Sequence, residues 1–390
     1  MAPQNAPVTG GFSHISQLDG IRGLAIALIV TYHFLSSNDH TTSRVVATFI
    51  GARSSLWVGV DLFFALSGFL ITGILFDTVQ SRTFLRSFYG RRSVRIFPLY
   101  FLALAVIGVM IFAQGKSWQG YQWPFFFYLN NTPLVLGQIV PEPLQEYSNH
   151  LWSLALEEQF YLLWPFAVLL VKDRRKLMTL AVGFSLVALI IRVTLLTRGW
   201  DTEFTYKMLP CRMDSLLIGG WLALAVRGPN RAVIIQRAKG VFGIAFLILL
   251  VDACLERGLN WSTSKFINSF GYTITAVAST ALIAVALNSA GTVSHFFRQA
   301  WLRTLGKYSY GIYVWHMIIG PSVVRYVRTQ MPLGTSSKLA HLIAGWVLGA
   351  LVSFIAGFIS YQAFEVHFLR LKRFFPYRES TAPKSSSTTT

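Results

Sequence analysis

The chain has 390 residues, of which 53% are hydrophobic and 15% aromatic, while only 13% are charged. A soluble globular domain carries about a quarter charged residues, so this composition excludes one. The formal net charge of +18 would indicate nucleic-acid binding in a soluble protein. In so apolar a chain it indicates basic cytoplasmic loops. We therefore expect a multi-pass protein of the cell (inner or plasma) membrane that binds no nucleic acid.

Windows of about 20 apolar residues, the length that crosses a bilayer as a helix, predict an all-α bundle of about ten spans. Residues 1–19 lack the pattern of a cleaved signal peptide, and we expect residues 1–17 to form a cytoplasmic segment. The predicted spans are residues 20–37, 56–76, 96–114, 151–171, 177–197, 208–226, 240–255, 267–288, 308–328 and 340–362.

Two further features refine the topology. The apolar stretch 121–137 is interrupted by two prolines and two asparagines, so we expect it to be re-entrant or interfacial. Of the 34 Lys and Arg residues, 22 then lie in alternate segments that include both termini, which places both termini in the cytoplasm. Residues 18–364 would form one membrane domain, and residues 365–390 a basic, disordered cytoplasmic tail.

The first predicted span carries Arg22 and His33, two ionisable side chains that lipid does not favour. Eleven residues separate them, which is about three helical turns, so both lie on one face and about 16 Å apart along the axis. A buried imidazole can act as a general base near neutral pH, and His33 is therefore a candidate catalytic residue. The alternatives are that Arg22 is only a basic flank and that His33 only bonds a neighbouring helix.

The second span carries Asp61 and, six residues later, Ser67. This spacing places the two side chains on opposite helix faces, which argues against a local Ser–Asp pair and favours Ser67 as a helix-contact residue. Asp61 falls towards the same side of the membrane as His33. It could orient the imidazole as a carboxylate does in a catalytic triad, and Asp61 is included among the candidate catalytic residues.

Five arginines lie in residues 82–95, directly before the third span. Topology alone explains this charge. Arg92 and Arg95, however, are three residues apart and share a helix face, a geometry that suits binding of phosphate groups. No glycine-rich phosphate loop accompanies them, so nucleotide hydrolysis is not predicted.

The fourth span places Glu157 and Glu158 inside an apolar helix. Adjacent residues point about 100° apart, so at most one faces a given cavity, and the other can pair with an arginine such as Arg192 or Arg212. Glu158 is included among the candidate catalytic residues, the alternative being a structural set of intramembrane salt bridges. His316 is predicted to be a hydrogen-bonded interior residue. The two cysteines lie in apolar segments, and no metal site is predicted.

The order and spacing of these motifs resemble the acyltransferase-3 family of membrane-integral O-acyltransferases. The resemblance extends from Leu18 to about Phe364. Its motifs are Leu18–Gly23 with His33 eleven residues after Arg22, Gly59–Phe69, Arg92–Arg95 before Pro98, His150–Tyr161, Arg212–Asp214 and Gly306–His316.

The resemblance implies a ten-helix bundle that transfers an acyl group, most often acetyl, from cytoplasmic acyl-CoA to a hydroxyl, commonly of a glycan or lipid-linked glycan. It implies that His33 is the essential residue, that Arg22 belongs with it, and that Arg92 and Arg95 serve the acyl donor. Acyl-CoA would be a co-substrate, and no cofactor is expected to stay bound. The acceptor and the acyl chain length are left open.

Two other functions are compatible with charged residues inside the membrane. In a proton-coupled transporter or lipid-linked glycan flippase, His33, Asp61 and Glu158 would form a proton relay. Such a protein would move its substrate without an acyl donor. A structural scaffold would leave the intramembrane charges without a purpose, and it is the weakest of the three hypotheses.

Overall fold

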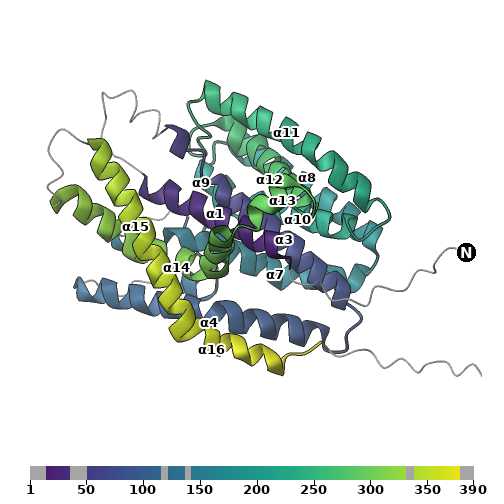
Figure 1. Cartoon of the computed structure of the whole chain (residues 1–390), viewed down its shortest axis with the longest axis horizontal. Coiled ribbons are helices and arrows are strands. Elements are labelled where there is room, and N and C mark those ends of the chain that lie inside the picture. Colours follow the sequence, from purple (N-terminus) through teal and green to yellow (C-terminus); the bar gives the residue numbers. More distant parts are fainter. Residues whose placement is uncertain (1–14, 36–50, 116–121, 137–141, 331–337, 378–390) are drawn as a thin grey trace, which may run out of the picture.

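The computed structural model describes residues 15–35, 51–115, 122–136, 142–330 and 338–377, and these residues form helices and no strand. Within this part of the chain, ten helices have 15 residues or more (Figure 1). They are α1 (Ser16–Phe34), α3 (Val58–Thr78), α4 (Phe84–Ala113), α7 (Trp152–Val171), α8 (Arg174–Thr197), α10 (Leu209–Ala225), α11 (Arg231–Leu255), α12 (Tyr272–Ala286), α14 (Ala300–Gln330) and α15 (Lys338–Ser360).

Each predicted span falls on one of these helices, and the all-helical fold is confirmed for the described residues. Seven segments are long and apolar enough to cross a membrane: Gly51–Thr78, Phe84–Ala113, Gln145–Val171, Arg174–Thr197, Arg231–Leu255, Ile267–Ala286 and Leu339–Phe374. The other three helices are α1, α10 and α14. Of these, α10 has only 17 residues, while α1 and α14 carry polar side chains that face the interior of the bundle. Ten crossings therefore stay a prediction.

Burial separates inner helices from outer ones. In Figure 1, α1 and α3 run through the middle of the bundle, with α8, α10, α11 and α12 on one side and α4, α14 and α15 on the other. The apolar part of α3 is 72% buried, whereas that of α11 is only 17% buried. Large apolar side chains of α11 cover its exposed face, which suits contact with lipid tails. Polar residues on α1, α3 and α14 thus lie where protein surrounds them.

Two glycine contacts bring the central helices close together. A Cβ on Gly23 of α1 would overlap the carbonyl oxygen of Leu302 in α14, and a Cβ on Gly306 of α14 would overlap that of Asp19. Gly68 of α3 is packed in the same way against the backbone of α10. Such contacts let membrane helices approach through their backbones. They place the neighbouring side chains of Arg22 and Ser67 over the interior.

The stretch 121–137 does not cross the bundle as a helix. In its described part, residues 122–136, the short helix α5 (Trp123–Phe126) is followed by turns. Side chains of α4 and α7 bond the backbone of this segment. The Tyr100 hydroxyl donates to Phe125 O at 2.7 Å, and the Gln159 amide donates to Tyr128 O at 2.7 Å. The prediction of a segment that is not a full span is therefore confirmed for these residues.

The C-terminal segment is ordered further than we predicted. After η4 (Tyr361–Glu365), the chain continues through α16 (Val366–Leu369) and η5 (Arg370–Phe374). The Ser87 hydroxyl of α4 donates to Pro376 O at 2.7 Å, and the Arg91 guanidinium donates to Phe375 O at 3.2 Å. Disorder from residue 365 was therefore wrong as far as Tyr377, because these contacts hold the segment. The predicted disorder of 378–390, and most of the predicted segment 1–17, fall outside the described residues.

The two ends of the described chain lie at the same end of the bundle. Ile15, just before α1, and Tyr377 line one cavity. The starts of α1 and α4 and the end of α3 also meet there, since Leu18, Phe88 and Thr78 line the same cavity.

Substitution of Gly306 by alanine should destabilise the bundle, because its Cβ would overlap the backbone of α1. Overpacking of this kind costs about 1–3 kcal/mol. The thermal unfolding midpoint of the detergent-solubilised G306A variant should fall by several degrees.

Gly240→Ala is the matched control, because no atom lies within 4 Å of the Cβ that it would add in α11. Its midpoint should stay the same or rise, since alanine favours a helix over glycine. Equal midpoints for the two variants would contradict the close contact between α1 and α14.

Candidate active site

Three adjoining cavities follow one face of α1. The basic cavity lies where α1 begins, and its lining includes Arg22. The central cavity follows. The histidine cavity lies beside the end of α1, and its lining includes His33. As the sequence predicted, one face of α1 presents the guanidinium and the imidazole to the interior.

Neighbouring cavities in this row have lining residues in common. The basic and central cavities share Arg22, Leu70, Arg92 and Arg95. The central and histidine cavities share Ile29, Val60 and Tyr313. The row of cavities therefore extends from one end of α1 to the other, over the distance that separates Arg22 from His33.

The basic cavity carries an excess of positive charge. Two carboxylates and six cations line it: Asp19, Asp77, Arg22, Arg91, Arg92, Arg95, Arg227 and Lys372. Both carboxylates are already paired, Asp19 with Arg22 at 3.1 Å and Asp77 with Arg227 at 2.7 Å. Among the described residues, Arg92 and Arg95 have no hydrogen-bond or ion-pair partner, which leaves their guanidinium groups available to an anion.

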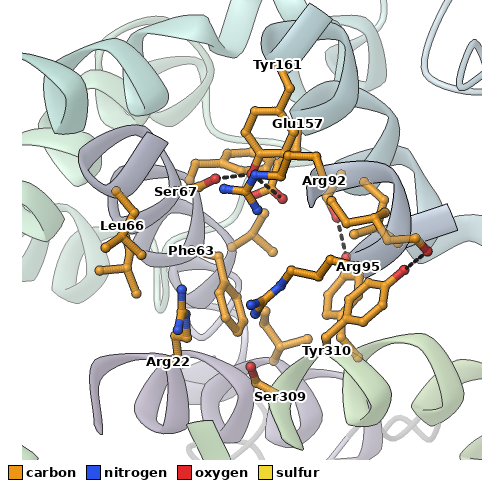
Figure 2. Close-up of a pocket in the computed structure, with 18 residues that line it drawn as sticks. Arg22, Phe63, Leu66, Ser67, Arg92, Arg95, Glu157, Tyr161, Ser309 and Tyr310 are labelled. Carbon is orange, nitrogen blue, oxygen red and sulfur yellow. Dashed lines mark hydrogen bonds between the residues drawn. The ribbon is translucent and has the colours of Figure 1, made fainter. Parts of the chain in front are cut away.

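Polar side chains from four helices meet in the central cavity. Figure 2 shows Arg22 of α1 and Arg92 and Arg95 of α4 turned towards the same space. Beside Arg92, the Tyr161 hydroxyl of α7 donates to Glu157 Oε2 at 3.1 Å and also bonds the Ser67 hydroxyl of α3. The Arg92 guanidinium lies 4.7 Å from the centre of the Tyr161 ring. This bonding fixes Ser67 and Tyr161, so the cavity has a rigid polar wall.

A second histidine orients His33. Nδ1 of His33 lies 3.0 Å from Ile29 O and 3.2 Å from Nε2 of His316, while Nδ1 of His316 lies 2.5 Å from Tyr313 O. A carbonyl oxygen only accepts, so both Nδ1 atoms carry the proton, and Nε2 of His316 accepts from Nδ1 of His33. Nε2 of His33 then holds a lone pair, and no described residue bonds it.

The ring of His33 lines the histidine cavity, so this lone pair is available to a substrate. A third histidine, His150, closes the cluster: its ring centre lies 5.0 Å from that of His316, and its Nε2 donates to Val314 O at 3.1 Å. Within the described residues, no group of three or more His, Cys, Asp or Glu side chains has the geometry to hold a metal ion.

Asp61 does not orient His33. Its carboxylate forms an ion pair with the Arg212 guanidinium at 2.7 Å and accepts from the Ser215 hydroxyl at 2.6 Å. Both partners of the pair are fully buried between α3 and α10. The hypothesis of an Asp61–His33 pair was therefore wrong, because the carboxylate faces α10 while the opposite face of α3 lines the central cavity, where Ser67 lies.

Of the two adjacent glutamates, Glu157 and not Glu158 faces the central cavity. Oε1 of Glu158 is buried and has no hydrogen-bond partner in the described part of the chain. Neither glutamate forms an ion pair there with Arg192 or Arg212, which pair with Asp214 and Asp61 instead. The prediction that at most one of the two faces a given cavity agrees with the central cavity, where that residue is Glu157. The catalytic role of Glu158 stays a prediction.

Sequence reasoning did not select Glu157, Tyr161, His316 or Arg53 for the site. Tyr161 lies one helical turn after Glu157, a spacing that places both on one face, so the pair could have been found. His316 lies 283 residues from His33 in sequence, and only the packing of α14 against α1 brings the two rings together. Arg53 lies in the segment just before α3, and only the tertiary fold brings it to the same cavity as His33.

Lys207, just outside the spans, also lines the histidine cavity. Its ammonium group donates to Asn149 Oδ1 at 2.8 Å and pairs with Glu203. Burial lowers the pKa of the Lys207 amine, and the Glu203 carboxylate opposes that effect.

Comparison with known proteins supports a transfer reaction. A family model described as an acyltransferase domain matches residues 15–362. The chain is 30% identical over 323 residues to the peptidoglycan O-acetyltransferase OatA of Listeria monocytogenes, covering 78% of this chain and 49% of that protein. It is 29% identical over 328 residues to the putative peptidoglycan O-acetyltransferase YrhL of Bacillus subtilis, with 78% and 48% covered.

A third relative is the O-acetyltransferase OatA of Staphylococcus aureus, which is 27% identical over 344 residues, with 82% of this chain and 53% of that protein covered. The chain thus spans about half the length of the curated relatives that it matches. No solved structure matches.

The pair of Asp61 and Arg212 predicts a stability effect. Asp61→Asn should leave a buried, unpaired guanidinium, which costs about 3–5 kcal/mol. Arg212→Met should leave the buried Asp61 carboxylate without its guanidinium partner. The thermal unfolding midpoint should fall strongly in both single variants.

The double variant Asp61→Asn/Arg212→Met removes both charges, so it should be more stable than the two separate losses together predict. Additive losses in this double-mutant cycle would show that the two side chains do not act as a pair.

Proposed function

The chain belongs to the acyltransferase-3 family, and on this basis we propose that it is a membrane-bound O-acyltransferase that transfers an acyl group from acyl-CoA to a hydroxyl of a glycan. The acyl group is acetyl, in keeping with the names of the relatives. The observation that carries the proposal is the row of cavities along α1, which joins a surplus of guanidinium groups at one end to an imidazole with a free lone pair at the other.

The protein crosses the cell membrane ten times, with the basic cavity on the cytoplasmic side. Two observations support this topology. The two ends of the described chain meet at the basic cavity, which requires an even number of crossings. Lys and Arg residues are also concentrated in the segments at that end, as expected for cytoplasmic loops.

The basic cavity receives the donor. The phosphate groups of coenzyme A are multiply charged anions, and Arg22, Arg92 and Arg95 offer planar, forked donors that match phosphate oxygens. The same three arginines line the central cavity, so a donor held by them can extend its thioester towards His33. Acyl-CoA is consumed as a co-substrate, and the proposal needs no resident cofactor.

His33 performs the proton transfer. In direct transfer, Nε2 of His33 takes the proton of the acceptor hydroxyl as the hydroxyl oxygen attacks the thioester carbonyl carbon. The carbon–sulfur bond then breaks, and the coenzyme A thiolate receives that proton. In the alternative route, Nε2 attacks the carbonyl carbon first, and the carbon–sulfur bond breaks to release the thiolate. The acceptor oxygen then attacks the acyl-imidazole, the bond from Nε2 to the acyl carbon breaks, and the hydroxyl proton passes to the thiolate. In both routes the bond from Nδ1 to His316 holds the ring in place and stabilises its positive charge.

The acceptor is an envelope glycan that reaches the histidine cavity from the opposite side. The names of two relatives, which describe peptidoglycan O-acetylation, support a cell-wall glycan. The transporter or flippase hypothesis is not favoured, because the matching family and the relatives are acyltransferases.

Loss of His33 should abolish transfer. In liposomes supplied with labelled acetyl-CoA and a glycan acceptor, kcat of H33A should fall about 10²–10⁴-fold, the range for loss of a general base. Binding of acetyl-CoA should remain, because the arginines of the basic cavity are intact.

His295→Ala is the control, since His295 is exposed in α13 (Thr292–Phe297) and lines none of the three cavities. Near-normal turnover by H33A would remove His33 from the chemistry. Glycan movement without donor would favour the transport hypothesis instead.

Loss of Arg95 should weaken donor binding. A charge-assisted hydrogen bond contributes about 1.5–3 kcal/mol, so KM for acetyl-CoA should rise about tenfold or more in R95Q. The salt dependence of KM should also become weaker.

Arg175→Gln serves as the control, because Arg175 is exposed at the start of α8 and lines neither the basic nor the central cavity. A KM for acetyl-CoA that is equal in R95Q, R175Q and wild type would show that coenzyme A binds elsewhere.

A further inference from the structure

Beyond His33, the histidine cavity has an aromatic wall that the transfer reaction does not use. Trp261 and Tyr206 stack with their ring centres 4.3 Å apart and an interplanar angle of 11°. The Trp261 indole N–H donates to the Tyr32 hydroxyl at 2.9 Å, and Trp57 meets Tyr206 edge-on at 6.0 Å. These four side chains form one fixed aromatic wall, in which Trp57 and Tyr206 are buried and Trp261 and Tyr32 are partly exposed.

This wall suits a sugar ring. A pyranose has apolar C–H faces and a polar rim, so it can pack a face against aromatic rings while its hydroxyls form hydrogen bonds. Lys207, Glu203 and Asn149 provide donors and acceptors along the same cavity. Their mutual bonds keep these side chains in position.

One cation of the cavity has no counter-charge among the described residues. The Arg53 guanidinium lies 5.0 Å from the centre of the Tyr32 ring, and its buried Nε atom has no hydrogen-bond partner in that part of the chain. Among the described residues, Arg53 forms no ion pair, whereas Lys207 is neutralised by Glu203. The charged side chains that line this cavity therefore have one net positive charge, which is on Arg53. It lies next to the aromatic wall, in the same cavity as His33.

A buried donor that is left unpaired destabilises the fold, and a charged one does so more strongly, so Arg53 fits a site that an anion completes. A guanidinium binds both carboxylates and phosphates through two parallel hydrogen bonds. One surplus charge matches a carboxylate, which carries a single negative charge. A phosphate monoester carries about −1.5 to −2 and would be left unbalanced.

We propose that the histidine cavity is the acceptor site and that it selects an acidic sugar, with the sugar ring against the face of Trp261 that Tyr206 leaves uncovered and its carboxylate on Arg53. The inference rests on the proposed O-acyltransferase function. It makes Arg53 a residue that determines acceptor specificity, since it contacts the acceptor and not the donor. The acidic group directs the hydroxyl of the bound sugar towards His33.

The test compares three disaccharides that differ at one position: cellobiouronic acid, cellobiose and cellobiose 6′-phosphate. Full-length protein in liposomes receives labelled acetyl-CoA and each disaccharide, and kcat/KM is measured for wild type, R53Q and R53K. Wild type should favour cellobiouronic acid over cellobiose at least tenfold. In R53Q the ratio of kcat/KM for the acid to kcat/KM for cellobiose should fall towards one, because KM for the acid rises. R53K should keep only part of the preference, because lysine lacks the forked donors of a guanidinium.

Arg198→Gln is the matched control, because Arg198 is an exposed arginine that does not line the histidine cavity. It should keep the wild-type preference. No preference in wild type, an unchanged preference in R53Q, or a greater preference for the phosphate would each overturn the proposal. An equal fall of kcat for the acid and for cellobiose in R53Q would also overturn it, since Arg53 would then stabilise the transition state.

A second measurement separates this inference from the proposed function. Binding of cellobiouronic acid and of cellobiose is measured without any donor, by saturation-transfer NMR on protein in nanodiscs. If wild type binds the acid preferentially and R53Q loses this preference, the result supports the acceptor site even when no acetyl transfer is detected. The absence of transfer would then count against the acyltransferase function alone. Equal binding of both sugars contradicts the acceptor site whatever the turnover.

Discussion

A charge inside a membrane bundle must have a partner, a polar cavity or a ligand, and this constraint explains where the ionisable residues of the chain lie. An uncompensated charge at mid-membrane costs about 2.5–3.5 kcal/mol on insertion scales. Asp61 with Arg212, and Asp214 with Arg192, satisfy the constraint in fully buried pairs. Arg92 and Arg95 line cavities and have no such partner among the described residues, and this difference separates groups that hold the bundle together from groups available to a substrate.

Much of the fold could be predicted from the sequence, because apolar length and basic loops report directly on a bilayer. All ten predicted spans fall on helices of the structure. The helices least recognisable as spans are α1, α10 and α14, whose polar residues face protein and not lipid. Helical spacing also predicted correctly that Arg22 and His33 share a face, since that geometry is local to one helix.

Partners between helices could not be predicted in the same way. The sequence places Asp61 and His33 towards the same side of the membrane, but it does not show which face of α3 meets α10. In the structure, Asp61 forms an ion pair with Arg212. His33 instead bonds His316 of α14, which is 283 residues away in sequence. The sequence could not show that Glu157 faces the central cavity for the same reason, because a difference of one residue turns the side chain by about 100° and only packing decides which direction is inward.

The central claim is that donor and acceptor meet inside the bundle, along the face of α1 that carries Arg22 and His33. The most direct measurement is a cryo-electron microscopy structure of the protein in nanodiscs with S-ethyl-coenzyme A, a thioether that cannot transfer its ethyl group. We predict that its phosphates lie against Arg22, Arg92 and Arg95 and that its ethyl group points through the central cavity towards Nε2 of His33. A coenzyme A bound outside the row of cavities, or with its ethyl group turned away from His33, would contradict this.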